Sequence, residues 1–124
     1  MRLLVADDDA DMRQSMRLLL ERAGHEVGLA QNGAKALELQ RTRPADVLIT
    51  DIFMPESDGL ETIERFRREF PGVRIIAMSG GGVRFKGETF LETASIAGAD
   101  AVLRKPFDKR VLLDTLRGLA PAPR

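Results

Sequence analysis

Apolar residues alternate between two spacings along this chain, and that alternation restricts the possible folds more than any other feature. Short apolar runs of the kind that forms buried strands occur five times, at 3–6, 25–30, 47–50, 73–78 and 101–103. Segments with apolar residues three and four apart follow them, at 12–23, 34–42, 60–70, 88–97 and 112–119. Continuous apolar strands are typical of parallel sheets that are covered on both faces. Five strand–helix repeats therefore predict an α/β fold with a central parallel sheet and right-handed crossovers.

The size and charge of the chain indicate one soluble domain with no electrostatic preference for a polyanionic partner. Its 124 residues can bury one hydrophobic core, and we expect residues 1–120 to form the domain and 121–124 a short tail, either a frayed end or the stub of a linker. Nineteen basic and nineteen acidic residues cancel, so binding to nucleic acid or to a membrane surface is not expected. The sequence has no signal peptide, no long apolar span and no cysteine, which favours the cytoplasm.

Polar residues suited to chemistry follow four of the five predicted strands. Asp7 and Asp8 follow the first strand, Asp51 the third, Ser79 the fourth and Lys105 the fifth. The carboxyl ends of parallel strands lie at one edge of the sheet, where ligands of such folds bind. Taken singly, each residue has an ordinary structural explanation as a cap, a turn residue or a surface lysine. Their joint placement, on strands expected to be neighbours, favours one functional site.

The first acidic run holds more carboxylates than a helix cap requires. Asp9 or Asp11 is expected to cap the first helix, which leaves Asp7 and Asp8 without that role. Carboxylates held close together repel one another, and a hard divalent cation such as magnesium removes that cost. A phosphoryl group arriving at Asp51 would need its oxygens neutralised, by the cation, a lysine and a hydroxyl. The pattern is thus suited to formation of an acyl phosphate.

Along essentially its full length the chain resembles the receiver domains of bacterial two-component response regulators. Each shared motif is short, but all of them occur in order and each lies at the end of a predicted strand. The motifs are "VADDD" at 5–9 with Arg13 in the next helix, "DIFMPESDG" from Asp51, "MSG" at 78–80, "GAD" at 98–100 and "KPF" at 105–107. The resemblance implies a flavodoxin-like (βα)5 three-layer sandwich around a five-stranded parallel sheet of order 2-1-3-4-5.

The resemblance also implies the roles of the acidic residues. By position, Asp51 is the phosphoacceptor and contacts the metal. Asp8 corresponds to a direct metal ligand, Asp7 to a second one that often acts through water, and the main-chain carbonyl of Phe53 to a further ligand. The expected cofactor is Mg²⁺, with Mn²⁺ as an alternative.

On the phosphate side, the resemblance assigns Ser79 and Lys105. Ser79 would donate a hydrogen bond to the phosphoryl group and couple it to a conformational change, and Lys105 would pair with the phosphate ahead of a cis peptide bond to Pro106. The implied phosphoryl donor is a sensor histidine kinase or a histidine phosphotransfer protein. The effector is unidentified, and the protein is expected to be a monomer or a weak dimer.

Two features depart from the family pattern. Val102 stands where receivers commonly carry an aromatic residue whose rotamer reports activation, so that route is in doubt here. The loop at 80–90, "GGGVRFKGETF", makes the segment between Ser79 and Lys105 longer than is common. It is interpreted either as a partner-specific switch loop or as a flexible insertion.

The leading hypothesis is a stand-alone receiver that signals through protein contact and is not an enzyme, beyond assisting its own phosphotransfer and slow dephosphorylation. A relay shuttle to a histidine phosphotransfer protein is the alternative. A magnesium-dependent aspartyl-phosphate phosphohydrolase is more distant, because it needs an aspartate where Phe53 stands, and a flavin-binding module would have its phosphate repelled by the carboxylates. His25, the only histidine, is expected to be structural or to lie on the surface. The charged segment 64–69 is expected to be a solvated helix face.

Overall fold

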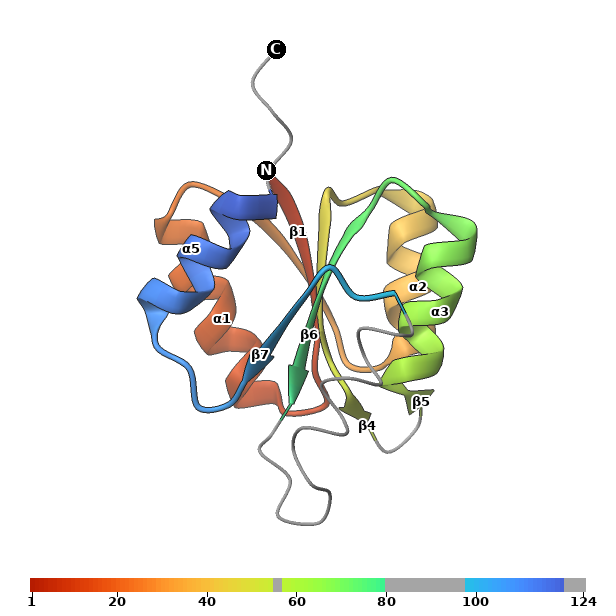
Figure 1. The fold of residues 1–124 in the computed structure, drawn as a ribbon, viewed down its shortest axis with the longest axis horizontal. Coiled ribbons are helices and arrows are strands. Elements are labelled where there is room, and N and C mark those ends of the chain that lie inside the picture. Colours follow the sequence, from red (N-terminus) through yellow and green to blue (C-terminus); the bar gives the residue numbers. More distant parts are fainter. Residues whose placement is uncertain (55–56, 80–97, 120–124) are drawn as a thin grey trace.

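The computed structural model describes residues 1–54, 57–79 and 98–119, and a five-stranded parallel sheet lies at its centre (Figure 1). The strands run in the order β2-β1-β3-β6-β7, which is order 2-1-3-4-5 when only the central strands are numbered along the chain. The predicted sheet and its order are therefore confirmed. The strand bounds are β1 (Arg2–Ala6), β2 (Glu26–Ala30), β3 (Val47–Asp51), β6 (Arg74–Ser79) and β7 (Ala101–Arg104).

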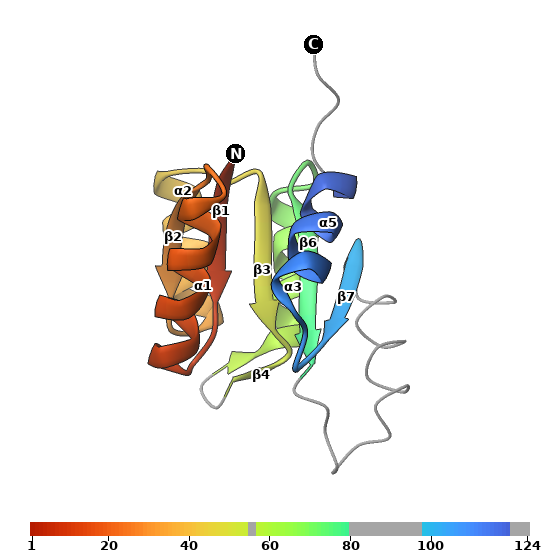
Figure 2. The same cartoon turned by 90° about the vertical axis from the view of Figure 1, so that its left-hand side faces the viewer.

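Helices cover both faces of this sheet, as the alternation of strands and helices predicts. α1 and α5 lie on one face, and α2 and α3 on the other (Figures 1 and 2). The helix bounds are α1 (Ala10–Arg22), α2 (Gly33–Thr42), α3 (Gly59–Glu69) and α5 (Lys109–Leu119). The helix predicted at 88–97 falls outside the described residues.

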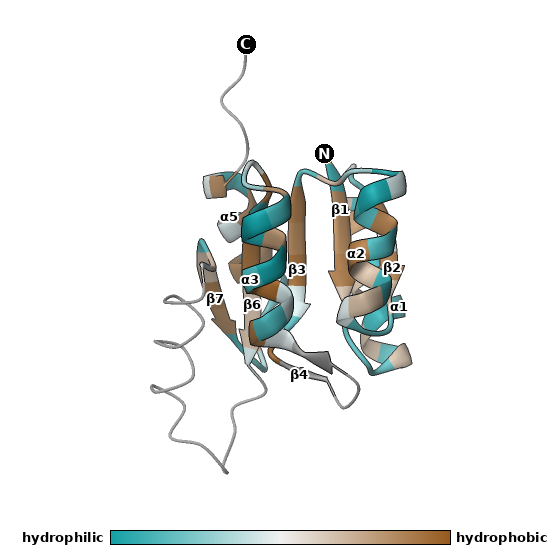
Figure 3. Ribbon diagram, turned by 90° about the vertical axis from the view of Figure 1, so that its right-hand side faces the viewer, coloured by the Kyte–Doolittle hydropathy of each residue, from teal (hydrophilic) through white to brown (hydrophobic). Residues whose placement is uncertain are grey.

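Alternate residues of each strand belong to two separate hydrophobic clusters, because successive side chains point to opposite faces of the sheet. On the α1/α5 face, Leu3, Val5 and Ile49 pack with helix residues such as Leu20 and Leu112. The cluster on the α2/α3 face is built from Leu4, Leu48, Ile75, Leu37, Ile63 and Phe66, among others. The central strands are correspondingly hydrophobic, whereas the exposed side of α3 is mostly hydrophilic (Figure 3). The strands thus carry little polarity except where they end.

Some boundaries differ from those predicted. Asp51 and Ser79 are the last residues of their strands rather than the residues that follow them. α5 begins at Lys109, three residues before Leu112, the first apolar position that marks this helix in the sequence, because the Asp108 carboxylate accepts a hydrogen bond from the Val111 amide at 3.0 Å. A short antiparallel hairpin, β4 (Phe53–Met54) with β5 (Ser57–Asp58), lies between β3 and α3, where no strand was predicted.

Gly59, at the start of α3, allows this helix to approach the end of β3. A Cβ atom at Gly59 would lie 2.4 Å from the main-chain oxygens of Asp51 and Ile52, a distance that no larger residue tolerates. The Gly59 amide also donates to the Ile52 oxygen at 3.0 Å. The requirement for glycine here keeps the chain after Asp51 tightly folded against the sheet.

Arg67 of α3 is not part of a solvated helix face, which corrects the interpretation of segment 64–69. Its guanidinium donates to the carbonyls of Gly98 at 2.7 Å and Val73 at 2.9 Å, and to the Asp100 carboxylate at 2.6 Å. Asp100 also accepts from the Ile75 amide at 2.7 Å. Phe66, in the same segment, is fully buried. Arg67 therefore fastens α3 to the chain entering β6 and β7.

We expect Arg67→Met to lower the free energy of unfolding by about 2–3 kcal/mol, because it leaves part-buried carbonyls and a carboxylate without their donor. The matched control is Arg65→Met, since Arg65 lies on the same helix but, among the residues that the structure describes, makes only a surface ion pair with Glu69 at 3.8 Å. Urea unfolding followed by circular dichroism measures both values. Equal effects for the two variants would contradict the assigned role of Arg67.

Candidate functional site

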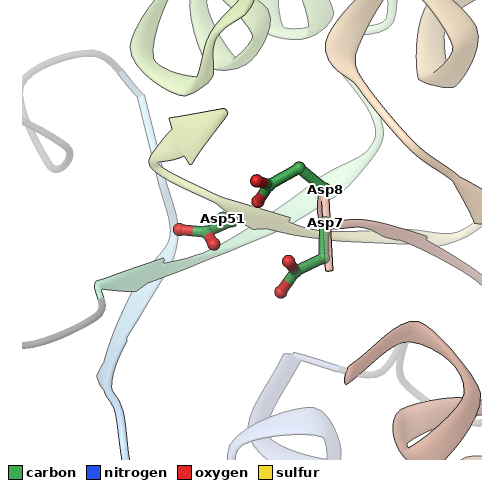
Figure 4. A group of neighbouring side chains, drawn as sticks. All are labelled: Asp7, Asp8 and Asp51. Carbon is green, nitrogen blue, oxygen red and sulfur yellow. The ribbon is translucent and has the colours of Figure 1, made fainter. Parts of the chain in front are cut away.

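Three predicted acidic residues meet at the carboxyl edge of the sheet. β1 pairs directly with β3, up to Ala6 opposite Thr50, so Asp7, Asp8 and Asp51 lie side by side. Each of the three offers a carboxylate oxygen, and these oxygens lie within 4.8 Å of one another. Figure 4 shows Asp7 and Asp8 leaving the end of β1 on opposite sides, with Asp51 coming from β3. Asp7 is 1% exposed and Asp51 7% exposed, whereas Asp8 is open to solvent.

Lys105 brings a positive charge to this cluster from two strands away. Its Nζ donates to Asp7 Oδ2 at 2.9 Å and to Asp51 Oδ2 at 3.1 Å. The Lys105 amide donates to the Ser79 carbonyl at 2.7 Å, which continues the pairing of β6 with β7. The peptide bond between Lys105 and Pro106 is cis. The sheet thus brings together the carboxylates and the ammonium that were predicted to converge.

The pKa of Lys105 is set by two opposed effects. Burial disfavours the charged ammonium and by itself lowers the pKa. The hydrogen bonds from Lys105 to Asp7 and Asp51, together with the negative charge of both carboxylates, outweigh burial and raise the pKa above its ordinary value. Lys105 is therefore cationic at neutral pH and balances part of the negative charge around it.

The aspartates that follow β1 have different roles, as the sequence predicted. Asp9 is the N-cap of α1, and its carboxylate accepts from the amides of Asp11 and Met12 at 2.9 and 3.3 Å. Asp7 instead accepts a hydrogen bond from the Asp9 amide at 2.9 Å and from Lys105. Capping therefore needs Asp9 alone, and Asp7 and Asp8 are left to the site.

Three further residues named from the sequence lie on strands of the structure: Ser79 on β6, Phe53 on β4 and Val102 on β7. Ser79 is 1% exposed and lies one residue beyond Met78, which pairs with Asp51. Phe53 begins β4, two residues after Asp51, and the metal-binding role of its carbonyl stays a prediction. Val102, in β7, is partly buried and packs against the core on the α2/α3 face. The predicted switch loop at 80–90 lies outside the described residues.

His25 lies at the opposite end of the sheet from the acidic cluster. It precedes β2, and the N-terminal nitrogen of Met1 is 3.3 Å from its Nδ1 atom. Burial, followed by the charge of the N-terminus, lowers the pKa of His25. Its position excludes it from the chemistry of Asp51.

The donor atoms of the cluster suit magnesium. Mg²⁺ prefers oxygen ligands at about 2.1 Å, so two oxygens on one ion lie at most about 4.2 Å apart. The three carboxylate oxygens are within 4.8 Å of one another, and small side-chain rotations or a bridging water would bring them into range. Asp8, the exposed member, leaves the cluster open to solvent. The residues present therefore fit a hard divalent cation.

Arg13 is a residue near the site whose role the sequence did not reveal. Its guanidinium donates to the main-chain carbonyl of Asp7 at 2.7 Å. Two signals in the sequence mark Arg13: its place in the motif shared with receiver domains, and its spacing from the acidic run. It stands six residues after Asp7, which brings the first turns of a helix back over the end of the strand.

In metal-free buffer we expect Lys105→Met to lower the free energy of unfolding, by somewhat less than the ~3–5 kcal/mol lost when a fully buried pair loses one partner. Because the folded-state pKa of Lys105 is raised, its stabilisation is complete below the unfolded-state pKa of about 10.4 and disappears as pH rises through the folded-state pKa. The difference between wild type and variant should thus be constant from neutral pH to about pH 10 and shrink above it.

Urea unfolding at a series of pH values, with a chelator present, measures this difference. Lys35→Met is the matched control, because within the described part of the chain the Lys35 ammonium makes only an exposed ion pair with Glu38, at 3.7 Å. A difference for Lys105→Met that persisted unchanged into strongly alkaline solution would argue against the ammonium as its source.

Comparison with known proteins connects this arrangement to one family. The family model described as the response regulator receiver domain matches residues 3–117. The response regulator receiver protein CpdR of Brucella abortus (strain 2308) is 39% identical over 116 residues, which are 93% of this chain and 92% of that protein. The response regulator MprA of Mycobacterium sp. (strain KMS) is 36% identical over 118 residues, 95% of this chain, which spans 50% of that longer relative.

Solved structures give the same result at the level of the fold. A response regulator receiver domain protein from Clostridium thermocellum superposes with a TM-score of 0.86 at 28% identity, covering 95% of this chain and 92% of that one. The chemotaxis protein CheY4 of Vibrio cholerae does so with a TM-score of 0.85 at 29% identity, covering 96% and 98%. No helix among the described residues is long and apolar enough to cross a membrane. With its sheet order, its acidic cluster and these relatives, the chain belongs to the response regulator receiver domain family.

Proposed function

We propose that the protein accepts a phosphoryl group on Asp51 and transmits the resulting signal through contact with another protein. The observation that carries this proposal is the convergence of Asp7, Asp8 and Asp51 with Lys105, whose Nζ lies 3.1 Å from Asp51 Oδ2. Such a grouping of like charges costs stability, and it is typical of a site that handles a cation and an anionic group. Membership of the receiver family supports the same reaction.

In the proposed reaction, a carboxylate oxygen of Asp51 attacks the phosphorus atom of the donor. The new O–P bond forms as the P–N bond to a donor imidazole breaks, and the imidazole nitrogen keeps the electron pair. Lys105, already hydrogen-bonded to Asp51, would move its ammonium to a phosphoryl oxygen, and the Ser79 hydroxyl would donate to another. Magnesium bound by Asp7, Asp8, Asp51 and the Phe53 carbonyl, or manganese in its place, would supply the remaining charge neutralisation.

The proposed donors are a sensor histidine kinase or a histidine phosphotransfer protein, and the proposed setting is the cytoplasm. The protein would act as a stand-alone regulator, monomeric or weakly dimeric, without catalytic turnover beyond its own slow dephosphorylation. The relay shuttle uses the same chemistry with the acyl phosphate passed on to a second histidine. A phosphohydrolase has no specific support, because Phe53 provides no acid or base at the required position.

The experiment is to incubate the protein with magnesium and acetyl phosphate and to follow its intact mass. We expect one phosphoryl group to be added to wild type and none to Asp51→Asn, because the amide cannot act as the nucleophile. The added group should be labile in acid and in base, as an acyl phosphate is.

Asp9→Asn is the matched control, since it removes a carboxylate from the same acidic region but keeps the helix cap. It should be labelled as wild type is. Labelling of Asp51→Asn at the wild-type rate would show that the acceptor is another residue. Phosphotransfer from a panel of purified histidine kinases would then identify the physiological donor.

A further inference from the structure

The turn between β1 and α1 is closed by three hydrogen bonds that link Asp7, Asp9 and Arg13 in a ring. The Asp9 amide donates to Asp7 Oδ1 at 2.9 Å. The Arg13 amide donates to the Asp9 carbonyl at 3.0 Å, and the Arg13 guanidinium returns to the Asp7 carbonyl at 2.7 Å. The side chain of Arg13 therefore completes a ring that the backbone alone leaves open.

The guanidinium acts on the peptide group that joins the two acidic residues following β1. The pairing of β1 with β2 ends at Ala6 and Ala30, apart from the Asp7 amide, which donates to the Ala30 carbonyl at 3.1 Å. The Asp7 carbonyl lies beyond that ladder and is held by Arg13. Because the Asp7 carbonyl and the Asp8 amide share one planar peptide unit that includes the Asp8 Cα atom, fixing this carbonyl restricts where the Asp8 side chain begins.

We propose that Arg13 is a positioning residue that sets the orientation of Asp7 and Asp8 for binding a divalent cation. This inference rests on the proposed function, since it concerns the same metal site. Asp7 is already held at its amide and at both carboxylate oxygens, by Ala30, Asp9 and Lys105. Asp8, by contrast, is exposed to solvent. It is joined to Asp7 by the peptide bond whose carbonyl accepts the hydrogen bond from Arg13.

The sign of the effect distinguishes positioning from simple electrostatics. The guanidinium is positively charged and repels a dication, so removing it would tighten cation binding if charge alone mattered. If Arg13 orients the ligands, removing it weakens binding in spite of the lost repulsion. Residues that orient metal ligands typically affect affinity by about 10- to 100-fold, which is large enough to show above the electrostatic effect.

Isothermal titration of the full chain with MgCl₂ tests the inference. We expect the dissociation constant for Mg²⁺ to rise about tenfold in Arg13→Met, and by less in Arg13→Lys, which keeps the charge and one donor. Arg17→Met is the matched control: Arg17 lies one turn further along α1, and within the described residues it pairs only with Glu21, at 3.5 Å. This control should bind Mg²⁺ as wild type does or slightly more tightly.

The rate of labelling by acetyl phosphate, measured against magnesium concentration, gives a second readout. A positioning role raises the magnesium concentration for half-maximal rate in Arg13→Met and leaves the rate at saturation near that of wild type.

Unchanged or tighter Mg²⁺ binding in Arg13→Met would overturn the inference while leaving the proposed function intact. Failure of wild type to bind Mg²⁺ would overturn the proposed function instead. If circular dichroism shows that Arg13→Met is unfolded, Arg13→Gln replaces it. Weaker Mg²⁺ binding in Arg13→Gln than in wild type would support the inference, and unchanged or tighter binding would overturn it.

Discussion

The organisation of this protein depends on holding three carboxylates and one ammonium together where the parallel strands end. Oxygens of Asp7, Asp8 and Asp51 that lie within 4.8 Å of one another repel strongly, and the low exposure of Asp7 and Asp51 strengthens that repulsion. Lys105, at 2.9 and 3.1 Å from two of them, supplies the countercharge. Such a cluster stabilises the fold poorly by itself, so its presence indicates chemistry that needs it.

The hydrophobic cores on the two faces of the sheet stabilise the fold against the repulsion within this acidic cluster. Strand residues such as Leu3 and Leu4 are buried on opposite faces, so each strand is held by packing from both sides. Free energy from that packing offsets the electrostatic cost at one edge. The backbone around the cluster is also fixed locally, by the ring through Arg13 and by the close approach that Gly59 permits. The site is therefore assembled on rigid elements, which precise positioning requires.

Features that depend on near neighbours in the chain were predictable from the sequence, whereas contacts between distant residues and very short strands were not. Period and capping chemistry predicted the strands, most of the helices and the N-cap at Asp9, because these depend on near neighbours in the chain. Arg67 was interpreted as solvated because its neighbours are charged, yet its partners Gly98 and Asp100 are more than thirty residues away. The hairpin formed by β4 and β5 was missed because strands of two residues have no detectable periodicity.

By itself, the sequence determined the class of fold and the kinds of group at the site, since apolar period and strand-end residues are local properties of the chain. The resemblance of its motifs to receiver domains extended this to the sheet order and to a role for each residue. Only the tertiary structure decided the distances: that Lys105 Nζ reaches both Asp7 and Asp51, and that Arg13 holds the carbonyl of Asp7. The physical reason is that these contacts depend on how β7 and α1 pack against β1 and β3, and packing is a property of the whole folded chain.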